Sequence, residues 1–234
     1  MKSLLVIFLL TLATPKASGF LDGSTETKLF SEHQQEDWLF NVIGDGRNHL
    51  LDFVKSVDQR GIWFYYEKEN FNETPGKMYL ISGDSVTADL PADFPHIIGS
   101  LRPAQQFLAF GQDIINVYEK GTFTGKSDYS KEDLPKFKIG EAASLVITSY
   151  NPWTVYTGEY YTGDSLCVTP YTDLNLTSNP PVPMVGYYPY ISKMGVPMTI
   201  KSARHGCYSD DVVQPAPVIK LDGRTEAGGW GPIV

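Results

Sequence analysis

The sequence predicts an all-β protein of the sandwich or barrel class, and three observations support this prediction. No long segment has the 3.6-residue hydrophobic period of an amphipathic helix; the best helical candidate, residues 46–57, is short and mixes helix and strand periods. Short runs of β-branched and aromatic residues recur between Gly, Pro, Asn and Asp. Three short motifs also repeat imperfectly along the chain, which is typical of a protein built from copies of one unit.

Residues 1–19 have the pattern of a secretory signal peptide. Lys2 precedes an apolar run over residues 4–13, and Ala17-Ser18-Gly19 provides a small-residue cleavage site. The run is shorter than the roughly 20 residues that span a bilayer. A buried N-terminal strand or helix is the alternative. No later segment reaches transmembrane length, so we expect a soluble, secreted, extracellular mature chain.

The chain is acidic. Its 234 residues include 19 Lys and Arg and 27 Asp and Glu, for a formal net charge of −8. Loss of the leader would remove two lysines and no acid, which leaves 17 basic residues and a balance of −10. This charge argues against a nucleic-acid partner, because phosphate neutralisation needs clustered Lys and Arg. The length suits one large domain or two domains of about 100 residues.

The strands predicted for the mature chain are short runs separated by turn residues. The clearest runs are residues 62–66, 114–118, 145–148 and 153–156. Residues 179–183 contain three prolines that lack backbone donors, so we expect a long exposed loop there rather than a central strand. The tail, residues 211–234, contains further Pro and Gly and reads as a loosely attached C-terminal extension.

An oxidising compartment changes the interpretation of the two cysteines, Cys167 and Cys207. Two is the number needed for one disulfide, which we favour. The alternative is a reactive or metal-bound thiol, because His205 lies two residues before Cys207, but a zinc site needs four spaced ligands. The same compartment makes Asn72 and Asn175 candidate glycosylation sites, since each begins an Asn-x-Thr sequon.

The repeats predict the architecture. One motif is a Tyr, an aromatic residue five positions later and a Gly two positions after that. It occurs as Tyr118, Phe123 and Gly125, then as Tyr156, Tyr161 and Gly163, and more loosely as Tyr66 and Phe71 with the glycine delayed to Gly76. A second motif is Asp-Leu-Pro followed by an aromatic residue, at residues 89–94 and 133–137. A third is a serine among apolar residues that closes each unit, at Ser56, Ser100, Ser144 and Ser202.

These motifs have a common physical explanation. The aromatic residue can fold over its own hairpin and cover the core, while the glycine permits a positive φ or a close backbone approach. The serine hydroxyl can bond a backbone group of the same unit and hold its last strand. A single unit could not bury its apolar face, whereas a pair of units could.

The motifs resemble those of the βγ-crystallins, whose Greek-key units carry Tyr-x4-(Phe/Tyr)-x-Gly in a folded hairpin and a serine before the last strand. Residues 114–163 match best. The resemblance implies four units in two Greek-key β-sandwich domains, over residues 21–106 and 107–210. The first domain is degenerate, because residues 38–57 contain no hairpin motif of this kind.

Calcium-binding members of that family carry the hexapeptide (N/D)(N/D)xx(S/T)S, which supplies the oxygen ligands that calcium requires. The four hexapeptides that end at the closing serines all lack the acidic or amide pair. The first has Asp52 with a competing Lys55, and the second begins Pro95-His96. We therefore expect no tight calcium site, no other metal site and no cofactor.

One segment, Gly163-Asp164-Ser165-Leu166, spells the G-D-S-L block of a lipase and esterase family. In that family the block lies near the N-terminus and an Asp-x-x-His lies near the C-terminus. Here Ser202 stands three residues before His205, so that aspartate is missing, and a serine without an oriented base is inert at neutral pH. We predict that the chain is not an enzyme.

The expected function is a secreted, non-enzymatic structural or binding protein, whose partner would be an unidentified extracellular protein or glycan. Two alternatives are a defence or toxin-like protein that acts with membrane-active partners, and a GDSL-like serine esterase. The stretch Tyr187-Tyr188-Pro189-Tyr190 is either a partner or sugar-stacking surface or a loop whose aromatics pack back on the sheet.

Overall fold

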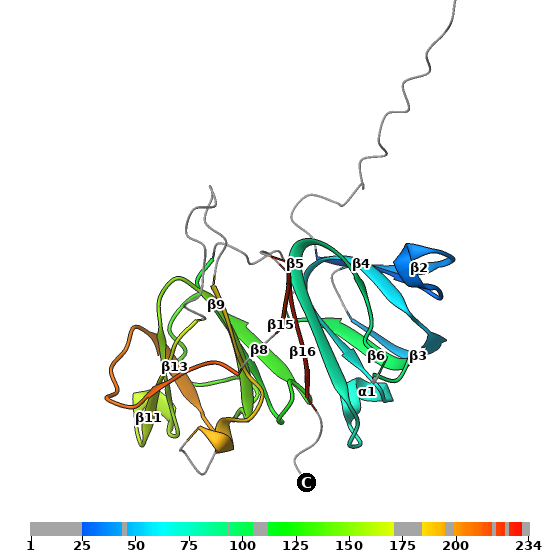
Figure 1. Ribbon diagram of the computed structural model, residues 1–234. Helices are drawn as coiled ribbons and strands as arrows, with labels where there is room; N and C mark the ends of the chain where they lie inside the picture. The colour runs from blue at the N-terminus through cyan, green and yellow to red at the C-terminus, as the bar shows by residue number, and fades with distance from the viewer. Residues whose placement is uncertain are drawn as a thin grey trace, which may run out of the picture.

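The computed structural model describes residues 25–43, 46–92, 94–104, 112–170, 184–194, 199–216, 219–222 and 225–230. This part of the chain is all-β, as predicted (Figure 1). It contains one eight-stranded sheet and two four-stranded sheets. Its helices are single turns, and none is long and apolar enough to cross a bilayer. The expected leader, residues 1–19, and the sequon at Asn175 lie outside the described residues.

The N-terminal domain contains two Greek-key units. Its strands are β1 (Glu26–Phe30), β2 (Trp38–Ile43), β3 (Arg47–Phe53), β4 (Ser56–Tyr66), β5 (Met78–Asp89) and β6 (Ile97–Pro103), with the short turns η1 (His33–Gln35) and α1 (Glu69–Asn72). The segment 46–57, our best helical candidate, forms β3 and the start of β4. The helical interpretation is therefore wrong, because strand pairing overrides a mixed hydrophobic period.

The two N-terminal units exchange strands. β4 runs from the first unit into the second through Gly61, whose φ is +105° and where a Cβ would lie 2.6 Å from Thr25 Cγ2. Its first part pairs with the end of β5, and its second part pairs with the start of β5 and with β6. β3 of the first unit pairs with β6 of the second, so neither unit is complete alone.

The C-terminal domain contains the third and fourth units. Its strands are β7 (Ile114–Tyr118), β8 (Ser127–Ser130), β9 (Ser144–Ser149), β10 (Trp153–Tyr156), β11 (Ser165–Val168), β12 (Met184–Tyr188), β13 (Ser202–His205) and β14 (Val212–Val213), with the turns η2 (Glu159–Tyr161) and η3 (Ile191–Lys193). Sheet β12-β9-β7-β8 packs on sheet β13-β10-β11-β14 around a core that includes Trp153, Phe137 and Ile147.

Tyr187 and Tyr188 belong to β12 and are buried. The Tyr187 hydroxyl lies 2.8 Å from Ser82 Oγ in the N-terminal domain, and the Tyr188 hydroxyl donates to the carbonyl of Thr169. The aromatics of this stretch therefore pack back on the sheets, and the alternative of an exposed sugar-stacking surface is wrong for these two residues.

The tail is part of the fold, so our prediction of a loosely attached extension is wrong. β14 pairs in parallel with β11, and β15 (Ile219–Asp222) and β16 (Thr225–Trp230) extend the eight-stranded sheet through β5. Figure 1 shows β15 and β16, in dark red, between the two domains. Pairing uses backbone groups, so a Gly-rich segment that reads as a loop can still complete a sheet beside an otherwise open strand edge.

Candidate functional site

All four units carry the same folded hairpin. A short turn with left-handed backbone follows the first strand of each unit, and the turn residues include Gln35, Phe71, Phe123 and Tyr161, each with φ between 56° and 63°. In three units the turn brings an aromatic ring against the preceding tyrosine. The ring pairs are Tyr66–Phe71, Tyr118–Phe123 and Tyr156–Tyr161, with centroids 5.6–5.8 Å apart in edge-to-face contact.

The closing serine fixes this turn in every unit. In the third unit, Ser144 Oγ accepts a hydrogen bond from the Phe123 N–H at 2.9 Å and donates one to the Lys120 carbonyl at 2.6 Å. The same two bonds join Ser56 to Gln35 and Glu32, Ser100 to Phe71 and Lys68, and Ser202 to Tyr161 and Gly158. Each serine therefore satisfies two backbone groups that a left-handed turn leaves without partners.

The sequence motifs did not identify the first hairpin, which lies just before residues 38–57. Phe30, Gln35 and Asp37 occupy the positions of the tyrosine, the aromatic residue and the glycine. Asp37 has φ of 55° and accepts a 2.8 Å bond from Ser31 Oγ, and aspartate is one of the few residues that tolerate this backbone. The serine spacing could have found it, because Gln35 and Ser56 are 21 residues apart, as are Phe123 and Ser144.

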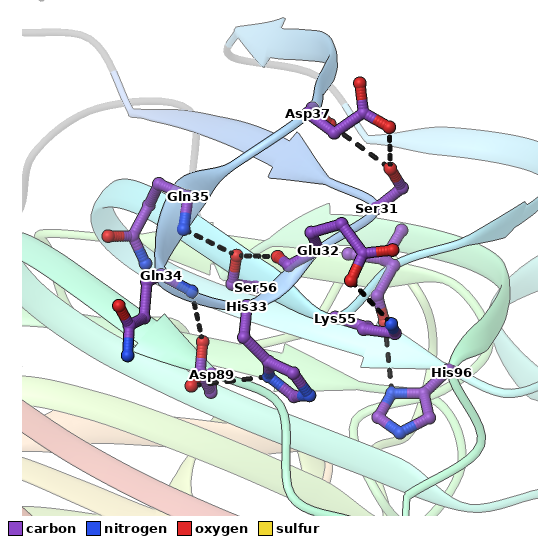
Figure 2. A network of polar contacts seen from close by, with 11 residues as sticks. Ser31, Glu32, His33, Gln34, Gln35, Asp37, Lys55, Ser56, Asp89 and His96 are labelled. Atoms are coloured by element: carbon purple, nitrogen blue, oxygen red, sulfur yellow. Dashed lines mark hydrogen bonds and ion pairs between the residues drawn. The ribbon is translucent and has the colours of Figure 1, made fainter.

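Figure 2 shows the polar network around this first hairpin. The Lys55 ammonium lies 2.7 Å from Glu32 Oε2, and the two carboxylate oxygens of Asp89 lie 3.0 Å from the Gln34 N–H and 3.3 Å from His33 Nδ1. The carboxylates of Glu32 and Asp89 are therefore paired with protein donors.

The positions that calcium would use in the other units also hold groups other than a carboxylate pair. His96 lies in the second hexapeptide, with Nδ1 3.2 Å from the Val54 carbonyl, and Glu141 of the third accepts a 2.9 Å bond from Thr199. Residues 195–198, where the fourth hexapeptide begins, lie outside the described residues. Within the residues that are described, no three His, Cys, Asp or Glu side chains converge on a metal position.

The domain interface is built on Arg102. Arg102 is 8% exposed, and its guanidinium lies over the rings of Phe71 and Tyr118 and donates to the Tyr66 hydroxyl at 3.2 Å. The terminal nitrogens cross to the C-terminal domain and donate to the carbonyls of Phe123 and Gly125. All five donors of a guanidinium point in one plane, so a single arginine can hold several acceptors in register.

Aromatic packing surrounds this arginine. Phe64 stacks on Phe123 with centroids 4.8 Å apart and an angle of 13° between the planes. The Tyr66 hydroxyl donates to the Phe123 carbonyl at 2.7 Å. Burial raises the pKa of Tyr66 and of Tyr118 because a phenolate would lose its hydration there. The two domains thus share one continuous apolar and hydrogen-bonded interface.

The fourth unit carries the disulfide. Cys167 on β11 is bonded to Cys207, with Cα atoms 5.2 Å apart, so neither cysteine is a free thiol. The segment around Cys207 lies across the outer side of the sheet: Thr154 Oγ1 donates to the Gly206 carbonyl at 2.6 Å and accepts from the Tyr208 N–H at 2.8 Å. The disulfide and these bonds hold residues 206–209 over β10 and β11.

The structure does not assemble an esterase site at Ser165. Ser165 lies on β11 beside an open cavity of about 860 Å³, and the lining includes Asp164, Asp210 and Asp211 but no histidine among the described residues. His205 pairs with Trp153, whereas Ser165 and Ser202 both pair with Tyr156, which places the imidazole roughly 10 Å further along the sheet. His205 does have a carboxylate partner, Asp133 at 2.9 Å, which sequence spacing could not indicate.

Asn72, the described sequon asparagine, is 7% exposed. Its amide nitrogen donates to the carbonyls of Gly76 and Lys77, both at 2.9 Å, and its oxygen accepts from the Lys68 N–H. Glycosylation of Asn72 stays a prediction, and it would require this amide to leave both carbonyls.

Comparison with known proteins agrees with the architecture. No protein-family model and no curated protein sequence matches the chain. Among solved structures it is similar to geodin, a βγ-crystallin from Geodia cydonium, with 19% identity, a TM-score of 0.56, and coverage of 78% of this chain and 99% of geodin. This likeness confirms the predicted βγ-crystallin Greek-key fold.

Two further solved structures match shorter parts of the chain. The fifth crystall domain of the non-lens protein Absent in melanoma 1 is 25% identical over 40% of this chain and 87% of that domain, with a TM-score of 0.31. A βγ-crystallin from an archaeon is 23% identical over 41% of this chain and 99% of its own, also with a TM-score of 0.31.

Proposed function

We propose that this chain is a secreted, non-enzymatic structural or binding protein that binds no calcium tightly. The observation that carries the proposal is the first hairpin. There the Lys55 ammonium is paired with Glu32 beside the closing serine, and Asp89 is paired with the Gln34 N–H and His33. A divalent cation would have to displace an ammonium group and compete with two existing partners of Asp89 for the same oxygens.

Calcium affinity depends on several oxygen ligands with carboxylate charge, in a geometry that leaves them available. Contacts within the protein stabilise the fold without a metal ion. They include the bonds of the four closing serines, the Arg102 interface and the disulfide. A disulfide is stable in an oxidising compartment, which supports an extracellular role. A folded unit with a covalent cross-link also suits a setting rich in proteases.

Calorimetric titration of the mature chain with calcium tests the proposal. We expect no binding tighter than the millimolar range. The matched variant Lys55→Ser removes the competing ammonium, and we expect it to bind calcium more tightly than the wild type while remaining weak. Micromolar binding by the wild-type chain would contradict the proposal.

The absence of esterase activity is tested with a fluorophosphonate probe, which labels activated serines. We expect no labelling of the mature chain, with Ser165→Ala as the matched control. Labelling that disappears in this variant would show that Ser165 is a nucleophile and would overturn the non-enzymatic assignment.

A further inference from the structure

The fourth unit repeats the side chains that join the two domains. Arg204 follows the closing Ser202 by two residues, as Arg102 follows Ser100. Its Nε donates to the Tyr156 hydroxyl at 2.7 Å, which is the counterpart of the Arg102–Tyr66 bond. The guanidinium carbon lies 5.5 Å from the ring centroids of both Tyr156 and Tyr161, and that of Arg102 lies 5.8 and 4.8 Å from Tyr66 and Phe71.

The two arginines differ in what covers them. Arg102 is buried against the C-terminal domain, and its terminal nitrogens reach the Phe123 and Gly125 carbonyls. Arg204 is half-buried, and its terminal nitrogens have no hydrogen-bond acceptor among the described residues. Besides the two tyrosines of its own hairpin, Tyr208 lies against it, with its ring centroid 3.7 Å from the guanidinium carbon, and Tyr208 is itself 59% exposed. Tyrosine and arginine are the residue types most enriched at the energetic centres of protein interfaces.

The fourth unit also carries the acceptors that such an arginine binds. Tyr161 and Gly163 are the counterparts of Phe123 and Gly125 in the repeated hairpin. No donor in the described part of the chain reaches the carbonyl oxygen of Tyr161 or of Gly163. A surface with both the donor and its acceptors is self-complementary, which is the condition for a two-fold symmetric contact between identical chains.

The charges near these acceptors fit the same arrangement. The residue after the hairpin glycine is Lys126 in the third unit and Asp164 in the fourth, and Asp164 is exposed. An arginine that approached the Gly163 carbonyl from a second molecule would therefore find an acidic residue next in the chain, where a lysine follows the Gly125 carbonyl that Arg102 reaches. Opposite charges across an interface select the partner and the register.

We propose that this face of the fourth unit, Tyr156, Tyr161, Asp164, Arg204 and Tyr208, binds a second copy of this chain. Arg204 of each molecule donates to the Tyr161 and Gly163 carbonyls of the other and pairs with its Asp164. The contact repeats between molecules the arrangement that joins the second and third units within one molecule.

Sedimentation equilibrium of the mature chain from micromolar to millimolar concentration tests this proposal. We expect a reversible dimer, which Arg204→Asp and Asp164→Arg each weaken by about tenfold or more. The double variant exchanges the two charges and should recover part of the lost affinity, because the ion pair is restored while an aspartate at position 204 cannot donate to the two carbonyls. Arg47→Ala, an exposed arginine on β3, is the control and should leave the dimer unchanged.

Thermal unfolding of each variant shows whether it is folded. Asp164→Arg changes an exposed side chain, so it tests the interface even if Arg204→Asp fails to fold. A chain that stays monomeric up to millimolar concentration would overturn the proposal. So would a dimer that neither charge variant weakens, or a double variant that remains as weak as the single ones.

Discussion

The Tyr66 hydroxyl donates a 2.7 Å hydrogen bond to the Phe123 carbonyl oxygen, across the boundary between the two domains. Both residues belong to repeated hairpins, since Tyr66 begins the second and Phe123 is the folded-over aromatic of the third. The residues that build each hairpin therefore also join the domains, and the interface follows from the repeat itself.

Replacement of Arg102 should weaken the contact between the two domains and so lower the free energy of unfolding. Arg102→Ala leaves the Tyr66 hydroxyl and the Gly125 carbonyl short of a partner in a buried interface, and we expect a loss of about 3 kcal/mol in the free energy of unfolding. Arg204→Ala is the matched control, because that arginine makes the same contacts within its own unit, and it should cost about 1 kcal/mol. Urea unfolding of dilute samples measures both, and equal losses would contradict the role of Arg102.

The closing serines should contribute more to stability than exposed serines elsewhere in the sheets. Ser144→Ala removes one acceptor and one donor from buried backbone groups of the third hairpin, and we expect a loss of about 2 kcal/mol in the free energy of unfolding. Ser127→Ala changes an exposed serine of β8 and should stay within about 0.5 kcal/mol of the wild type. Chemical denaturation of the two variants provides the comparison, and a neutral Ser144→Ala would refute this function of the serine.

The disulfide should stabilise the fourth unit, because it closes a long loop and so restricts the unfolded chain. Cys167 and Cys207 are 40 residues apart, and the chain-entropy model assigns such a loop about 3–4 kcal/mol. The double variant Cys167→Ala with Cys207→Ala should lose about that amount. Unfolding of the wild-type chain with and without a thiol reductant is the independent check; no change under complete reduction would contradict the prediction.

Alkaline pH should unfold the protein through its buried tyrosines. Burial raises the pKa of Tyr66 and Tyr118 above the value of about 10 in the unfolded chain. Below that pH both states hold the proton and the full contribution to stability is present. As the pH rises toward the folded-state pKa, the unfolded state alone releases its protons and stability falls. Tyrosinate absorbance of these residues should therefore rise together with loss of circular dichroism; ionisation in the intact fold would contradict this.

Sequence alone predicted the fold because two hairpins retain the full motif. Tyr118, Phe123 and Gly125, then Tyr156, Tyr161 and Gly163, gave the spacing, and the serines gave the number of units. The first hairpin escaped because Phe30, Gln35 and Asp37 perform the same backbone role with different side chains.

Two other features of the structure could not be predicted from the sequence. The pairing of β16 with β5 uses backbone groups, so its glycines indicated only a loop. The role of Arg102 depends on carbonyl groups of another domain, which residue types do not encode. The sequence places Arg204 two residues after Ser202, as Arg102 follows Ser100, but only the structure shows that both arginines donate to the tyrosine of their own unit.

The most direct test compares urea unfolding of the protein in excess calcium and in a chelator. If the protein's own side chains take the places that calcium would occupy, the two curves should share one cooperative transition and one midpoint. A midpoint that moves to clearly higher urea in calcium would contradict the account, because a bound ion would then be stabilising the folded hairpins.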